Sequence, residues 1–104
     1  MWTRLVPLKP FVEFRTVLVA KTEHYELWDV LVTARGGGAV DEITAKPSNG
    51  PVRLIGPGTQ RNLRSGQTHP FHVQIDDVGA RGSVRINTSG EVETTADVPV
   101  GGQP

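Results

Sequence analysis

The residues of this 104-residue chain best suited to bind a metal ion or move a proton are three histidines, His24, His69 and His72. His69 and His72 are three residues apart, with Pro70 between them. Residues separated by an odd number along an extended chain point to opposite faces, so this pair cannot hold one cation together. The chain has no cysteine, which excludes a thiolate site. We expect no metal and no cofactor, and interpret the histidines as surface residues on strands and turns.

Glycine-rich and serine-containing segments do not match a catalytic motif. The triplet Gly36–Gly38 lacks the lysine and the following helix that a phosphate-binding loop requires, so we interpret it as a hairpin corner. Ser65 and Ser83 lie beside glycines, but neither is in a Gly-x-Ser-x-Gly sequence. The sequence therefore predicts no nucleophilic catalysis.

Two adjacent pairs of carboxylates, Asp41 with Glu42 and Asp76 with Asp77, could serve acid–base chemistry. Neighbouring residues on a strand project to opposite faces, which prevents them from sharing a proton. Asp77 is assigned to a turn, and a calcium site built from Asp76, Asp77 and a distant carboxylate is left open. With no convergent catalytic set, we predict that the protein is not an enzyme.

The overall charge excludes long-range recruitment of a polyanion. Eleven basic residues balance eleven acidic ones, so we expect neither nucleic acid nor a membrane as a partner. The distribution is uneven: the stretch 44–74 has four basic residues and no acid, whereas 91–97 has three acids and no base. This pattern indicates either solvated loops or a molecule with two charged faces that contacts copies of itself or an acidic partner.

Alternating apolar and polar residues predict an all-β chain. Trp28, Val30 and Val32 share one face of the most hydrophobic segment, which is expected to be a central strand. A bulge or a switch between sheets is expected near Thr16, because the residues after it are apolar on both faces. The stretch 60–70 is interpreted mostly as loop. The expected strands are 11–20, 25–34, 39–45, 52–55, one entered at Phe71, 83–88 and 91–98.

Two sequence features carry a family resemblance: the strand and glycine corner within 30–43, and the run Leu63, Arg64, Ser65, Gly66, Gln67 before the Phe71 strand. They resemble bacterial and phage immunoglobulin-like domains, in which a Val–small–Gly–Gly corner and a Leu-x-x-Gly-Gln turn recur. The chain departs from the relatives in lacking the cysteine pair of antibody domains and in having Ala34 where many bacterial domains have asparagine.

The resemblance implies an immunoglobulin-like antiparallel β-sandwich of about seven strands with an N-terminal arm. We divide the chain into an arm at 1–9, the sandwich at 10–98 and a flexible tail at 99–104.

The arm is the predicted interaction site. Its apolar residues are Trp2, Leu5, Val6 and Leu8. Pro7 and Pro10 disfavour a regular element that could bury them, so the arm either packs across its own sandwich or attaches to a neighbouring subunit. Arg61 and Arg64 are expected at the polar rim of that contact.

The predicted function is a non-enzymatic structural or protein-interaction module, with a phage capsid or tail accessory protein as its suggested form. The expected partners are other protein subunits, either copies of the chain or virion proteins. The alternative is a carbohydrate- or small-ligand-binding module using Tyr25 and Trp2. Residues 1–10 contain charges and prolines where a secretory signal needs a continuous apolar region, so we expect a virion or cytoplasmic location.

Overall fold

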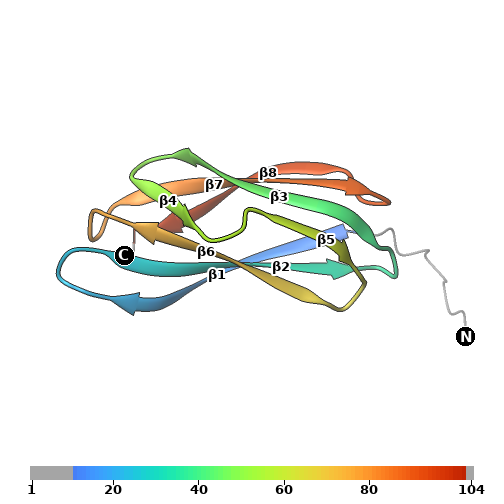
Figure 1. The fold of residues 1–104 in the computed structure, drawn as a ribbon, viewed down its shortest axis with the longest axis horizontal. Helices are drawn as coiled ribbons and strands as arrows, with labels where there is room; N and C mark the ends of the chain where they lie inside the picture. The colour runs from blue at the N-terminus through green and yellow to red at the C-terminus, as the bar shows by residue number, and fades with distance from the viewer. Residues whose placement is uncertain (1–10, 103–104) are drawn as a thin grey trace, which may run out of the picture.

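Two four-stranded antiparallel sheets pack face to face in the computed structural model, which describes residues 11–102 (Figure 1). One sheet has the strand order β1-β2-β6-β4 and the other β5-β3-β7-β8. The strands are β1 (Phe11–Lys21), β2 (Glu26–Arg35), β3 (Val40–Asn49), β4 (Val52–Ile55), β5 (Thr59–Leu63), β6 (Thr68–Ile75), β7 (Arg81–Gly90) and β8 (Thr94–Gly101). The predicted all-β sandwich is confirmed, with eight strands. No helix in this part of the chain could span a membrane.

A single apolar core fills the space between the sheets. Trp28, Val73 and Ile86 belong to it, and β2 is a central strand as expected. Inward residues alternate with outward ones along β2, β6 and β7, which is the pattern of strands with one buried face. The largest fully buried side chains are Phe71, Ile43, Ile75, Ile86, Val30, Val32, Val40, Val73, Val84 and Val100.

Hydrogen bonds link the two turns that carried the family resemblance. Gly36 and Gly37 have φ angles of 79° and 81°, which favour glycine, and the Gly37 N–H donates to Ser65 Oγ at 2.9 Å. In the second turn the Arg64 N–H donates to Gln67 Oε1 at 2.9 Å. The glutamine of the Leu-x-x-Gly-Gln run thus closes its own turn.

The prediction that residues 60–70 are mostly loop is wrong. β5 pairs with β3, and β6 begins at Thr68. The sequence of β5, TQRNL, has one buried residue, Leu63, so it lacks the apolar alternation of a strand. Proline has no N–H group to donate to a neighbouring strand. The ladder between β4 and β6 ends at the Ile55–His72 pair, so β4 does not extend as far as Pro70. No hydrogen bond to β4 is therefore lost, and Pro70 is tolerated within β6.

The C-terminal boundaries also differ from those expected. β8 runs from Thr94 to Gly101, later than the predicted strand at 91–98. Val100 is 1% exposed, so residues 99–101 belong to the sandwich, although the sequence assigned them to a tail. The turn before β8 lies after Gly90, which is the last residue of β7. Proline at position 99 suggested the end of a strand, but β8 is an edge strand, where proline is accepted.

The irregularity in β1 lies between Leu18 and Ala20, two residues beyond the expected position near Thr16. β1 stays in one sheet and does not switch to the other. The residues from Val17 to Ala20, which are apolar on both faces, are exposed at the surface of this edge strand.

Candidate functional site

The structure places His69 and His72 on opposite faces of β6, as their spacing predicted. His69 is half-buried, and its ring meets Phe71 edge-on with ring centroids 4.6 Å apart. Burial, with a smaller effect from His72, lowers the pKa of His69. His72 faces outward, with Nδ1 2.6 Å from Asp29 Oδ1. His69 therefore packs against Phe71, and His72 pairs with the carboxylate of Asp29.

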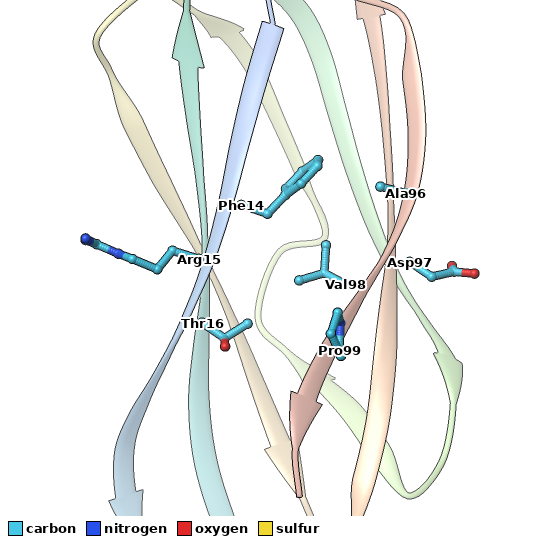
Figure 2. A pocket seen from close by; sticks show the side chains of 7 residues that line it. All are labelled: Phe14, Arg15, Thr16, Ala96, Asp97, Val98 and Pro99. Atoms are coloured by element: carbon cyan, nitrogen blue, oxygen red, sulfur yellow. The ribbon is translucent and has the colours of Figure 1, made fainter. Parts of the chain in front are cut away.

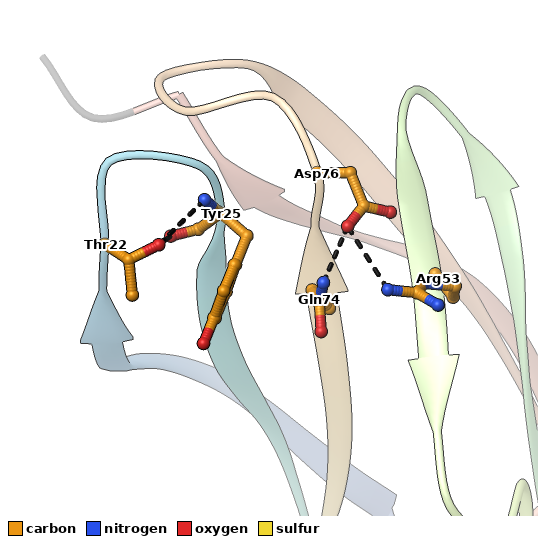
Figure 3. Close-up of polar contacts among 5 residues, drawn as sticks. All are labelled: Thr22, Tyr25, Arg53, Gln74 and Asp76. Atoms are coloured by element: carbon orange, nitrogen blue, oxygen red, sulfur yellow. Dashed lines mark hydrogen bonds and ion pairs between the residues drawn. The ribbon is translucent and has the colours of Figure 1, made fainter.

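The carboxylates considered for calcium are used in local contacts. Asp76 Oδ1 accepts hydrogen bonds from Gln74 Nε2 at 2.6 Å and Arg53 Nη2 at 3.3 Å (Figure 3). The Asp77 carbonyl accepts the Ala80 N–H at 3.0 Å, which places Asp77 in a turn as predicted. Across residues 11–102 no three histidine, cysteine or acidic side chains form a metal-binding group.

Tyr25, the candidate for carbohydrate binding, is half-buried at the end of the β1–β2 hairpin (Figure 3). Thr22 Oγ1 accepts the N–H groups of His24 and Tyr25, both at 3.1 Å, and fixes the turn. Among the described aromatic residues, Phe11 is the one that is exposed, and it lies at the opposite end of β1. The carbohydrate alternative stays a prediction.

A shallow groove of about 250 Å³ runs between the edge strands β1 and β8. Phe14, Thr16 and Val98 point into it, whereas Arg15 and Asp97 point away (Figure 2). Arg85 Nε lies 2.9 Å from Asp97 Oδ1 and holds the pKa of that carboxyl below its usual range. The groove therefore has an apolar floor and no convergent acid–base pair.

Within residues 11–102, no strand pairs with the outer edge of β1. The Ala34 N–H donates to Gln67 O at 3.1 Å, and its carbonyl accepts the Gly66 N–H at 2.7 Å, so both groups of Ala34 point toward β6. Val12 lies opposite Ala34 in the ladder, so its N–H and C=O point away from β2. The N–H and C=O groups of Phe14 and Thr16 also point away from β2, because these residues follow Val12 at intervals of two along the strand.

Apolar side chains gather on this strand. Within residues 11–102, four of the five exposed large hydrophobic residues are on β1, and the fifth, Ile55, is on β4. Their exposed fractions are 43% for Phe11, 41% for Val17, 39% for Leu18 and 57% for Val19. We call residues 11–19 the β1 edge. The sequence showed the apolar run, which was attributed to a bulge or a switch between sheets, although a strand that is apolar on both faces can also mark a docking edge.

The arginines predicted for the polar rim lie on the other side of the sandwich. Arg61 is on β5, the edge opposite β8 in its sheet, and its Nε is 3.4 Å from Glu42 Oε2. Arg64 is exposed in the following turn. The basic and acidic stretches find separate local partners, as Arg61–Glu42, Arg53–Asp76 and Arg85–Asp97. The arm residues Trp2, Leu5, Val6 and Leu8 lie outside the described residues.

One buried carboxylate escaped the sequence reasoning. Glu26 is 2% exposed; its Oε1 accepts the Trp28 indole N–H at 2.8 Å and its Oε2 accepts the Gly79 N–H at 2.7 Å. The Gly79 amide, then the Trp28 indole, lower its pKa. Glu26 joins β2 to the β6–β7 turn and has a structural role. A glutamate two residues before an inward tryptophan on the same strand face was the available signal.

Comparisons with known proteins support the fold alone. No protein-family model and no curated protein matches the sequence. The crystal structure of a FixG-related protein from Vibrio parahaemolyticus is similar, with a TM-score of 0.56 and 12% sequence identity over 92% of this chain and 94% of that chain. At that identity the likeness extends to the β-sandwich and not to a shared activity.

Proposed function

We propose that this chain is a non-enzymatic, immunoglobulin-like protein-interaction module that docks through the β1 edge. The observation that carries the proposal is the concentration of exposed apolar side chains on one edge strand whose outer backbone groups have no partner strand among residues 11–102. Such an edge can add a strand from a partner, which supplies both main-chain hydrogen bonds and burial of side chains.

The chemistry of the remaining surface favours docking over catalysis. The groove beside β1 has an apolar floor, and the neighbouring Asp97 points away from it and pairs with Arg85. A virion location, with capsid or tail proteins as partners, is the narrower form of the proposal and rests on the sequence resemblance to phage domains. The arm predicted at 1–9 lies outside the described residues, and in the sequence it is followed by Pro10 and then by Phe11, the first residue of the β1 edge.

Position-specific photocrosslinking tests the docking edge. A benzophenone amino acid at Val19 is expected to give a discrete crosslinked product, either with the purified chain or in an extract of the source cells. The same probe at Ile55, which is 38% exposed on β4 at the other edge of the sheet, is the matched control and is expected to give none.

Competition separates docking from random capture. An excess of unlabelled wild-type chain is expected to suppress the Val19 product, whereas a Leu18→Lys chain suppresses it at least about tenfold less well, because burial of a lysine opposes docking. Equal products from both probe positions, or equal competition by both chains, would show that the β1 edge is not the docking site.

A further inference from the structure

We propose that the partner of the β1 edge is a second copy of this chain, whose β1 pairs antiparallel with the first and joins the two sheets into one. This inference rests on the proposed function, because it uses the same edge. Phe14 lies opposite Phe14 at the two-fold axis, and Glu13 lies opposite Arg15 on each side of it. A self-complementary contact of this kind closes as a symmetric dimer.

The direction of the backbone groups limits the possible registers. Val12, Phe14 and Thr16 direct their N–H and C=O groups outward, as the Ala34 bonds to the neighbouring turn show. The β1 strands of two copies can form backbone hydrogen bonds only when these residues of one copy lie opposite these residues of the other. With Phe14 on the axis, each Phe14 bonds its counterpart and Val12 bonds Thr16 of the second copy.

The charges then select one register. The outward side chains of the β1 edge, residues 11–19, include one acid and one base, Glu13 and Arg15, which face each other across the axis in this arrangement. The neighbouring registers that this rule allows shift the pairing by two residues and move the axis to residue 13 or residue 15. They place Glu13 opposite Glu13 or Arg15 opposite Arg15, and like charges directly opposite are destabilising. Larger shifts shorten the ladder or run it into the irregularity between Leu18 and Ala20.

The same register buries exposed apolar surface. Phe11 and Val17, which are 43% and 41% exposed, lie opposite each other on the outer face in both halves of the ladder. Within residues 11–102, Arg15 forms no ion pair, so it is available to Glu13 of the second copy. Glu13 has an exposed pair with Arg35 at 3.5 Å, which is a weak competitor.

A charge-reversal experiment tests the register. Sedimentation equilibrium over a concentration series is expected to show a monomer–dimer equilibrium for the full wild-type chain. Glu13→Arg and Arg15→Glu are each expected to raise the dimer dissociation constant by about tenfold to a hundredfold, because two attractions become repulsions. An equimolar mixture of the two variants is expected to recover the wild-type constant, since each base again faces an acid.

An uncharged variant keeps the test independent of surface charge. Thr16→Pro removes an outward N–H that the register uses, and edge strands accept proline, so it is expected to weaken the dimer while circular dichroism still shows the fold. A wild-type chain that stays monomeric, a dimer indifferent to these variants, or a mixture that fails to reassociate would overturn self-pairing. The Val19 crosslink to a different protein would then still support the docking edge.

Discussion

Replacing Phe71 with alanine is expected to lower the free energy of unfolding by about 3–5 kcal/mol, because a buried ring is lost and the surrounding strands relax only partly. Phe71 is 0% exposed in the middle of β6, opposite Val30 of β2, and it contacts the His69 ring. Since small domains have only about 5–15 kcal/mol of stability, the variant should be near its unfolding threshold. Urea unfolding followed by tryptophan fluorescence measures the change.

Two controls separate the cavity from general loss of hydrophobicity. Phe71→Leu keeps most of the volume and is expected to cost roughly half as much as the alanine variant. Ile55→Ala removes an exposed side chain at the edge strand β4 and should change stability by less than about 0.5 kcal/mol. A loss below about 1.5 kcal/mol for Phe71→Ala would contradict the closed core between the two sheets.

The sequence predicted the core because side-chain alternation reports directly which face of a strand is buried. Trp28, Val30 and Val32, which the sequence placed on one face of a central strand, all lie in the interior of the sandwich. β5 was missed because its pairing with β3 is made by backbone groups, which leave no apolar pattern in the sequence. Residues 99–101 were missed because proline suggested an end, whereas the β7 ladder carries β8 through to Gly101.

The candidate site was harder to predict than the fold. The apolar run at Val17–Val19 is visible in the sequence, but only the strand order shows that it lies on a sheet edge. Likewise, Glu13 and Arg15 look like ordinary surface charges until the direction of the β1 backbone is known. A strand can bind a partner through its edge only if it lacks a neighbour on that side. The strand order of the whole fold decides this, and the local sequence of the strand does not show it.

Removal of the buried carboxylate of Glu26 is expected to cost about 2–4 kcal/mol, because Glu26→Ala leaves the Trp28 indole N–H without its acceptor and releases the Gly79 N–H. Glu26→Gln retains one acceptor oxygen, but its amide nitrogen then faces the other donor. The Glu26→Gln variant should therefore have a free energy of unfolding between those of the wild type and Glu26→Ala. Chemical denaturation at pH 7 measures both values, and a loss below about 1 kcal/mol for the alanine variant would show that water replaces these bonds freely.

The same contacts predict how the difference between wild type and Glu26→Gln changes with pH. The Gly79 amide and the Trp28 indole lower the pKa of Glu26 in the folded chain from 4.5. A carboxyl with a depressed folded pKa contributes stability above its unfolded pKa and loses it as the pH falls through the folded value. The free energy of unfolding of the wild type should thus exceed that of Glu26→Gln by a constant amount near neutrality, and this difference should shrink below about pH 4.5. Comparing the two chains at each pH cancels the contribution of Asp97, whose pKa is also lowered. A difference that stayed constant or grew on acidification would mean that the ionised carboxylate is not what holds the β6–β7 turn to β2.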